Sequence, residues 1–455
     1  MPRRVVLIST YELDRQPFGL ASPAAWLRHA GGAVTCLDLA VQRLDEEAIR
    51  AADLVAFYVP MHTATRLASA LVPRVKSLNP RAHLCFYGLY APVNEGYLRS
   101  LGADTILGGE FEAGLVSLLA RLPEGPNGAD QPEPVISLAR QKFLVPDRSG
   151  LEGLSRYAAL ILNGEKRVVG YTEASRGCKH LCRHCPVVPV YGGQFRIVQR
   201  DVVVEDIRRQ VAAGAEHITF GDPDFFNGIG HSLAIVRALH DEFPHITYDV
   251  TIKISHLREH AQHLQTLRDT GCLFVTSAAE SLDDRVLALL DKGHTRRDFE
   301  EVVRAFRKLG LTLAPTFVPF TPWISLEGYL ELLAALVDMD LIEHVAPIQL
   351  TIRLLIPAGS RLLNLREVRD LDEGFDGALL SYRWRHPDPR VDRLQDALQE
   401  LVRQEEALGA GREEIFGKVC LLAEQAAGKP CRPRGEKPLG PARTPIPFMT
   451  EPWFC

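Results

Sequence analysis

Two series of short apolar runs, each run followed by a helical segment, constrain the fold of this 455-residue chain most strongly. The first series has candidate strands at residues 5–9, 33–39, 54–59, 82–88 and 104–109. The segments between them end in Gly or Pro, as helices commonly do. This alternation predicts an α/β fold that begins with a doubly wound, Rossmann-like parallel sheet, which we place at residues 1–122.

The second alternating series predicts a barrel over residues 165–365. Six strand–helix units suit a partial (β/α)6 TIM barrel, in which functional groups gather at the carboxyl ends of the strands. Residues 123–164 include the polar, proline-rich stretch PEGPNGADQPEP and are interpreted as a linker. Residues 366–455 are predicted to form a helical C-terminal region with an irregular tail.

Composition and charge narrow the functional classes. With 46% hydrophobic and 24% charged residues, the chain has the composition of a soluble globular protein. Its net charge of −5 gives no reason to expect a nucleic-acid partner, and no apolar run is long enough for a membrane span. The N-terminus reads as a first strand rather than a signal peptide, so we expect a cytoplasmic protein in a reducing compartment.

Three of the nine cysteines lie within eight positions, in the sequence RGCKHLCRHCP, after the first strand predicted for the barrel. They are Cys178, Cys182 and Cys185. Thiolates suit clustered iron, and three of them leave one iron of a four-iron cluster open to a substrate. A noncatalytic zinc- or metal-binding protein, with His180 or His184 as fourth ligand, is the alternative, although zinc ligands usually come in two pairs far apart in sequence.

The C-x3-C-x2-C spacing resembles the motif of the radical S-adenosylmethionine (SAM) superfamily. In that family three cysteines ligate a [4Fe–4S] cluster, and the fourth iron binds the amino and carboxylate groups of SAM. An electron passed to the sulfonium then breaks a carbon–sulfur bond. The resemblance implies both cofactors, cluster ligation by Cys178, Cys182 and Cys185, and an electron donor such as flavodoxin or ferredoxin.

Segments after the later strands resemble the parts of this family that contact SAM. GDPDFFNG stands where family members carry a GGE-like segment, and SAAESLDD resembles their ES segment. Each segment also has a structural explanation, because acidic residues commonly cap helices. The residues that the resemblance places near SAM are Gly221, Asp222, Asp224, Lys253, Glu280, Ser281, Arg353 and Ile356.

A doubly wound domain before a radical SAM barrel resembles the cobalamin-binding subclass. Members that ligate cobalt through histidine carry D-x-H-x-x-G after the first strand, whereas ELDRQPFG has Asp14 and Gly19 without a histidine. Ligation by a protein histidine is therefore not expected. Cobalamin can still bind without a protein ligand over Gly88 and residues 108–110; alternatively, these glycines serve only tight strand–helix turns.

The sequence ends in TPIPFMTEPWFC, with Cys455 as its last residue. This tail resembles the radical SAM family named for its C-terminal CUAEP or CCAEP sequence, in which a similar segment runs into selenocysteine or a second cysteine. The resemblance implies that Cys455 is half of a catalytic Cys–selenocysteine pair; an ordinary C-terminus is the alternative. A soft nucleophilic pair suits a small-molecule or metalloid substrate that receives a methyl or 3-amino-3-carboxypropyl group.

Overall fold

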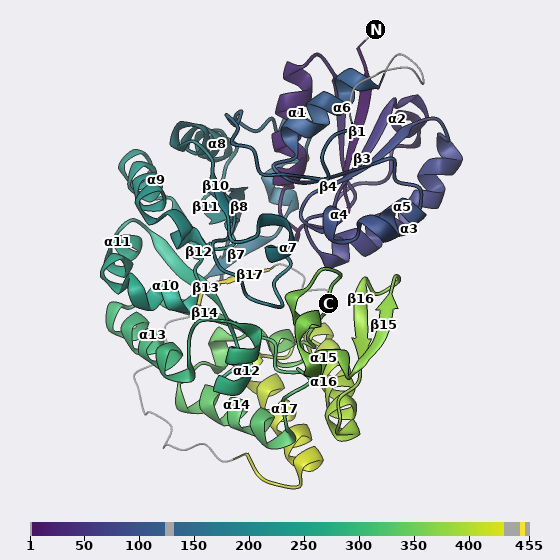
Figure 1. The fold of residues 1–455 in the computed structure, drawn as a ribbon. Coiled ribbons are helices and arrows are strands. Elements are labelled where there is room, and N and C mark those ends of the chain that lie inside the picture. The colour runs from purple at the N-terminus through teal and green to yellow at the C-terminus, as the bar shows by residue number, and fades with distance from the viewer. Residues whose placement is uncertain (1, 123–131, 432–445, 451–455) are drawn as a thin grey trace.

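The structure is a computed structural model that describes residues 2–122, 132–431 and 446–450. Figure 1 shows two sheets flanked by helices, the N-terminal sheet above and the barrel sheet below it. The predicted α/β fold, with a doubly wound sheet followed by a curled partial barrel, is confirmed. Among the helices of the described residues, none combines the length and apolar character needed to cross a bilayer.

The N-terminal sheet is parallel, with the strand order β2-β1-β3-β4-β5-β6. The order reverses at β1, so a crevice is expected where β1 and β3 end. The strands are β1 (Arg4–Ser9), β2 (Ala33–Asp38), β3 (Leu54–Tyr58), β4 (His83–Tyr87), β5 (Thr105–Gly109) and β6 (Ile136–Ser137). The helices are α1 (Phe18–His29), α2 (Glu46–Ala51), α3 (His62–Leu78), α4 (Tyr90–Val93), α5 (Glu95–Ser100) and α6 (Glu112–Arg121).

Both faces of this sheet are buried, which explains why its strands are continuous apolar runs. Successive side chains point to opposite faces of a strand. Val6 and Ile8 accordingly pack with residues of α2, α3 and α5. Val5 and Leu7 pack with residues of α1 and α6 on the other face. Helices therefore cover the sheet on both sides.

The barrel sheet has the order β14-β13-β12-β11-β8-β7-β17. Five neighbouring strands are parallel: β8 (Glu165–Thr172), β11 (His217–Phe220), β12 (Thr247–Thr251), β13 (Cys272–Glu280) and β14 (Thr312–Phe317). Next to β8, the strand β7 (Ala159–Leu162) and the edge strand β17 (Phe448–Met449) are antiparallel to their neighbours. Part of the stretch predicted as a linker and part of the predicted irregular tail therefore extend the sheet.

The sixth strand predicted for the barrel is reduced to one bridge. Phe320 and Arg353 pair in parallel, and the preceding residues form the 3-10 helix η5 (Pro347–Leu350). Pro347 and Pro357 flank this apolar segment. Because proline has no backbone N–H to donate, pairing is confined to the residues between them.

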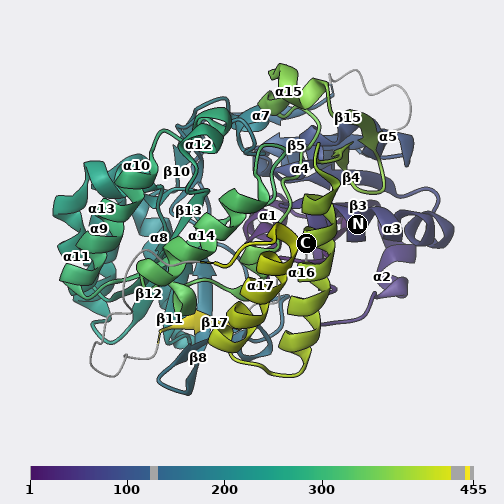
Figure 2. The same cartoon turned by 90° about the horizontal axis from the view of Figure 1, so that it is seen from below.

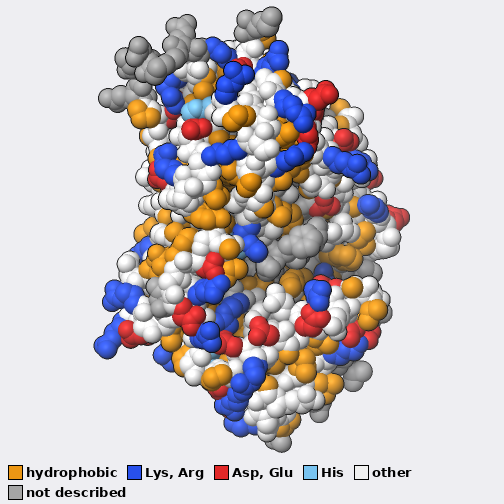
Figure 3. Space-filling model, turned by 90° about the vertical axis from the view of Figure 1, so that its right-hand side faces the viewer, with side chains coloured by type: hydrophobic (Ala, Val, Ile, Leu, Met, Phe, Trp, Pro, Cys, Tyr) orange, Lys and Arg blue, Asp and Glu red, His pale blue; other side chains and the backbone are white. Residues whose placement is uncertain are grey.

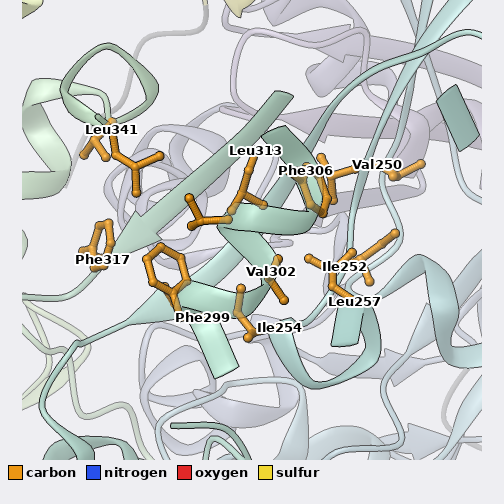
Figure 4. Packing of buried hydrophobic residues seen from close by; sticks show 14 of the residues in the cluster. Val250, Ile252, Ile254, Leu257, Phe299, Val302, Phe306, Leu313, Phe317 and Leu341 are labelled. Atoms are coloured by element: carbon orange, nitrogen blue, oxygen red, sulfur yellow. The ribbon is translucent and has the colours of Figure 1, made fainter. Parts of the chain in front are cut away.

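Helices cover the outer face of the barrel sheet. Figure 4 shows Val250 and Leu313 of the sheet packed toward Phe299, Val302 and Phe306 of α13. A capping box of Thr295 and Asp298 begins α13, and Gly310 ends it. The barrel helices are α8 (Arg200–Ala212), α9 (Ile229–Glu242), α10 (Ile254–Glu259), α11 (Leu264–Asp269), α12 (Asp284–Leu290), α13 (Arg296–Leu309) and α14 (Leu326–Asp338).

The C-terminal region is mainly helical, as predicted. Figure 2 shows α16 (Pro389–Ala407) and α17 (Arg412–Ala427) side by side, with α17 next to α14. A short helix, α15 (Arg366–Arg369), precedes a hairpin of β15 (Asp372–Asp376) and β16 (Ser381–Trp384). The remaining 3-10 helices are η1 (Leu154–Arg156), η2 (Phe225–Gly228), η3 (Ala261–His263), η4 (Ile342–His344) and η6 (Arg361–Asn364).

A buried ion cluster joins the two sheets at their carboxyl ends. Arg176, which is 6% exposed, forms two hydrogen bonds with Glu112 at the start of α6, at 2.7 and 2.9 Å. Its Nε donates to Glu173 at 2.6 Å, and Nη1 lies 3.7 Å from Glu110. Burial raises the pKa of Glu110 to about 7, despite the opposing effect of Arg176.

On the face shown in Figure 3, hydrophobic side chains gather in a band across the middle of the molecule.

We expect Arg176→Met to lower the free energy of unfolding by about 3–5 kcal/mol, because it leaves buried carboxylates without a partner. Burial raises the pKa of Glu110 to about 7 in the folded protein, and Arg176 opposes this rise. Without Arg176 the pKa of Glu110 rises further, so the variant loses additional stability as the pH increases through 7 and above. The deficit should therefore be larger at pH 8 than at pH 5.5.

Chemical denaturation at both pH values measures this deficit. Arg28→Met is the matched control, because Arg28 pairs with Asp147 nearer the surface and its loss should cost about 1 kcal/mol or less. Equal effects of the two substitutions would contradict the role given to Arg176.

Candidate active site

The three clustered cysteines lie on a loop at the carboxyl end of the first parallel barrel strand. A short hairpin of β9 (Ser175–Gly177) and β10 (Phe195–Ile197) holds the loop at its base, and α7 (Val188–Tyr191) follows the last cysteine. Gly177 has φ +75°, and a Cβ there would lie 2.3 Å from Tyr191 and 2.6 Å from the Gln194 carbonyl oxygen. Glycine is therefore required where the chain enters the loop.

The thiols themselves fit an iron–sulfur cluster. Cys182 is buried and Cys178 and Cys185 are half-buried, and no described cysteine forms a disulfide. Burial raises the pKa of Cys185 to about 12 and also raises that of Cys178. In this environment a bound cation, rather than water, must stabilise the thiolates. Soft iron is a suitable cation for three such sulfurs.

Glu280, at the end of β13, lies against the cysteine loop. Its Oε1 is 3.1 Å from His184 Nε2, between two of the cysteines, and 3.2 Å from Lys292 Nζ. Burial by itself would raise the pKa of Glu280, but Lys292 and His184 hold it well below its usual value. Glu280 also has φ +66°, a conformation that non-glycine residues rarely adopt and that clusters at functional sites.

Asp224, after β11, is the centre of a second contact with the loop. Its Oδ2 lies 2.7 Å from His256 Nδ1 and 3.3 Å from His180 Nε2. Burial opposes ionisation, yet the two histidines lower the pKa of Asp224 to about 2. Asp224 also accepts a hydrogen bond from the Phe226 amide at the start of η2. The carboxylate thus links the loop to the ends of two strands.

Asp222 and Gly221 have different surroundings from Asp224. Both Asp222 oxygens accept hydrogen bonds, from the Ala174 amide at 2.9 Å and the Ser175 hydroxyl at 2.5 Å. Burial raises the pKa of Asp222 to about 7 despite these bonds. A Cβ at Gly221 would lie 1.8 Å from Tyr171 Oη. Asp222 therefore supports the segment that leads into the cysteine loop.

The other residues predicted from the sequence lie farther apart. Lys253 begins α10, and its charge opposes the burial that raises the pKa of Cys178. Ser281 accepts a hydrogen bond from the Asp283 amide. Arg353 pairs with Asp392 at 2.6 Å and packs over Trp384, and Ile356 lies in an apolar cluster with Trp384. Cys455 lies outside the described residues.

A cavity of about 210 Å³ opens at the junction of the two sheets, beside the base of the cysteine loop. Glu12 reaches it from the loop after β1, and burial raises the pKa of Glu12 well above its usual value. Its lining includes Glu12, Tyr58, Phe111, Tyr171, Arg176 and Gly221. A small space lined by apolar, aromatic and charged side chains therefore lies where the carboxyl ends of both sheets meet.

Sequence reasoning missed Lys292, His256 and Arg176 as parts of this site. Lys292 lies twelve residues from Glu280, beyond a helix, and His256 lies within a helix after β12. Neither belongs to a local motif, so only the three-dimensional fold brings them to the cysteine loop. Arg176 could have been noticed because it stands two residues before Cys178 at a strand end.

A thiol-bearing loop at the mouth of a partial barrel, with charged groups from successive strand ends, defines a class of cofactor-dependent enzyme. Residues 172–333 match the family model of the Radical SAM superfamily. The chain thus contains a radical SAM domain and is an enzyme that uses a [4Fe–4S] cluster and SAM. This favours the catalytic interpretation over the noncatalytic zinc alternative.

Curated proteins align with this chain at low sequence identity. A hopanoid C-3 methylase of Methylococcus capsulatus is 24% identical over 324 residues, which cover 68% of this chain and 62% of the methylase. A putative methylthiotransferase of Methanocaldococcus jannaschii is 22% identical over 357 residues, 74% of this chain and 75% of that protein. The chain therefore aligns with less than two thirds of the length of the methylase.

Solved structures share the fold across nearly the whole chain. The cobalamin-dependent SAM radical enzyme OxsB, with aqua-cobalamin and SAM bound, aligns with a TM-score of 0.71 at 14% identity, covering 93% of this chain and 72% of OxsB. The radical SAM methyltransferase TsrM from Kitasatospora setae aligns with a TM-score of 0.62 at 16% identity, covering 94% and 100%. These likenesses confirm the arrangement of the two sheets.

The entry to the cysteine loop can be tested with two glycines. Gly177→Ala should destabilise the protein by about 3 kcal/mol or more and reduce iron incorporation. The added Cβ would overlap Tyr191 and the Gln194 carbonyl oxygen, and alanine is also strained at this positive φ. Gly192→Ala is the control: Gly192 also has positive φ but nothing within 4 Å, so only about 1–2 kcal/mol of strain is expected. Iron content after anaerobic reconstitution and denaturant unfolding measure both effects; equal iron loss would refute the assignment.

Proposed function

We propose that this enzyme cleaves SAM reductively with a [4Fe–4S] cluster bound by Cys178, Cys182 and Cys185. The SAM-derived group is then transferred to a small-molecule or soft-metalloid substrate at the junction of the two sheets. The observation that carries this proposal is the position of three thiols in one loop at the end of the first barrel strand. When bound and reduced, by a donor such as flavodoxin or ferredoxin, the cluster supplies one electron to the sulfonium of SAM.

The residues around the loop are suited to hold SAM. Both contacts of Glu280 with His184 and Lys292 use Oε1, so Oε2 can accept a hydrogen bond from a hydroxyl or ammonium group of SAM. Lys292 keeps the carboxylate ionised, so Oε2 remains an acceptor for a positively charged or hydroxyl donor.

Substitutions should separate cluster binding from SAM binding. Cys182→Ala should abolish both iron incorporation and SAM cleavage, because a thiolate ligand is lost. Glu280→Gln should retain the iron while weakening SAM affinity by about tenfold or more, because it removes a buried charge. Iron and sulfide analysis together with equilibrium SAM binding distinguish the two variants. Normal SAM affinity in Glu280→Gln would show that this carboxylate only positions the loop.

The C-terminal tail is proposed to take part in product formation. Two hydrogen bonds fix Thr450 to Ala159, and the adjacent Ala158 amide donates to the Asp14 carbonyl. The loop that contains Asp14 also lines the junction cavity through neighbouring residues. Strand β17 is antiparallel to β7 and therefore runs in the direction of β8, toward the cysteine loop.

The length of the remaining chain supports this role. Five residues follow Thr450 and can span up to about 17 Å when extended. This length, together with the direction of β17, supports a position of Cys455 nearer the cysteine loop than Thr450. Its thiol, alone or paired with a following selenocysteine as in the CUAEP/CCAEP-tail family, would hold a soft substrate or intermediate there.

Removing residues 451–455, or replacing Cys455 with Ser, should lower product yield at least about tenfold while leaving cluster content and SAM cleavage intact. Glu451→Gln is the control, since it changes the same segment without removing the thiol. Product and 5′-deoxyadenosine or methylthioadenosine are quantified by mass spectrometry in the same reactions. Equal yields for all forms would show that the tail is dispensable.

Methyl transfer through cobalamin is the second candidate, supported by the fold shared with OxsB and TsrM. The described residues do not fit a corrin as they stand. Tyr58 packs so closely against the β1–α1 turn that a Cβ at Gly19 would lie 2.1 Å from its ring, and Tyr87 donates to the Gly19 carbonyl. The junction cavity of about 210 Å³ is smaller than the pockets that hold drug-sized ligands. We therefore favour direct transfer.

A further inference from the structure

Two histidines and an aspartate meet beside the cysteine loop, each from a different element. His180 comes from the loop itself, Asp224 follows β11, and His256 lies on α10. Asp224 and His256 are only 1% and 2% exposed. The rings of His180 and His256 are 4.5 Å apart, with their Nε2 atoms separated by 3.2 Å. Three groups that can bind a metal ion therefore converge in a buried position.

Hydrogen bonds account for only part of this arrangement: the Phe226 amide donates to Asp224 Oδ1, and His180 Nε2 and His256 Nε2 bond to each other. Asp224 Oδ2 and His256 Nδ1 are 2.7 Å apart, an ion pair when the ring is protonated, but neither atom has a hydrogen-bond partner in the described residues. Buried polar atoms without a hydrogen bond destabilise the folded state. A cation placed among these atoms would remove that cost for both.

The spacing of the donor atoms suits one ion. Ligand atoms held 2.0–2.2 Å from a tetrahedral ion are about 3.3–3.6 Å apart. Asp224 Oδ2 and His180 Nε2 are 3.3 Å apart, and the 2.7 Å contact of His256 Nδ1 with Asp224 Oδ2 would have to lengthen by about 0.6–0.9 Å. Cys178, His180 and Asp224 offer ligand atoms that all lie within 4.8 Å of one another.

We propose that His180, His256 and Asp224 bind a divalent first-row ion, zinc or ferrous iron, beside the cysteine loop. Two imidazoles and a carboxylate are ligands that both ions accept. Because Cys178 is assigned to the cluster, the ion has three protein ligands and one open position. Such a site would stabilise the cysteine loop and offer a Lewis acid next to the cluster.

Cobalt(II) is a suitable probe, because it occupies zinc and ferrous sites and is detected by electron paramagnetic resonance. One equivalent is added to the anaerobically reconstituted full-length enzyme with its cluster oxidised, and bound cobalt is measured after desalting and by equilibrium dialysis. We expect about one cobalt per chain in addition to the cluster iron. Asp224→Asn and His256→Gln should each weaken binding more than about 100-fold.

His260→Gln is the matched control, because His260 follows α10 with its ring 5.7 Å from that of His256 but does not contact Asp224. It should bind cobalt as the unaltered enzyme does. The proposal would be overturned if the unaltered enzyme failed to bind cobalt, or if Asp224→Asn and His256→Gln bound it as tightly as the unaltered enzyme. The two histidines and the aspartate would then have only a structural role.

A variant with Cys178, Cys182 and Cys185 replaced by Ala separates this site from the cysteines. It should bind no cluster yet retain one cobalt, with circular dichroism confirming that it folds. Loss of cobalt in this folded variant would assign the ion to the cysteines and overturn the proposal. Iron, sulfide and SAM cleavage are measured in the unaltered enzyme, so the proposed radical chemistry can fail or succeed independently.

Discussion

The buried guanidinium of Arg176 is the interaction on which the arrangement of the two sheets depends. It stands two residues before the first clustered cysteine and forms two hydrogen bonds with Glu112 of the N-terminal domain. An unpaired charge at this depth would cost several kcal/mol, so the cation and its carboxylates must be buried together. The N-terminal domain thereby becomes one wall of the active site. Its orientation and the position of the cysteine loop are set by the same contact.

This coupling explains why glycine and short strands surround the loop. Gly177 lies directly between Arg176 and Cys178, where a side chain would overlap Tyr191. The base of the loop is restrained twice, by the pairing of β9 with β10 and by the hydrogen bonds between Arg176 and Glu112. The chain therefore has little conformational freedom there. Preorganised ligands lose less conformational entropy when a cluster or SAM binds. The loop is therefore fixed at its base by the fold, and its thiols are buried or half-buried beyond that base.

The sequence predicted the features that depend on local pattern. Continuous apolar runs located all five strands that pack between helices in the N-terminal domain, and the cysteine spacing located the loop. The short strands β6, β7 and β17 were missed because two to four residues carry no periodicity. The sixth barrel strand was predicted from an apolar run whose flanking prolines limit pairing. The partners of Glu280 and Asp224 could not be predicted, because they come from elements distant in sequence.

The acidic groups near the loop fall into two kinds, which have different consequences for ligand binding. Glu280 and Asp224 are buried beside cationic or imidazole groups that lower the pKa of each carboxyl, so both remain ionised next to the cysteines. Glu12, Glu110 and Asp222 lie where burial raises the pKa, to about 7 for the latter two. Ionised carboxylates thus lie beside the cysteines, where Lys292 balances the charge of Glu280, whereas the carboxyls at the junction are more readily protonated. The first region offers carboxylate oxygens to a sulfonium or a metal cation, while the second can hold an apolar group at a smaller cost of desolvating ionised carboxylates.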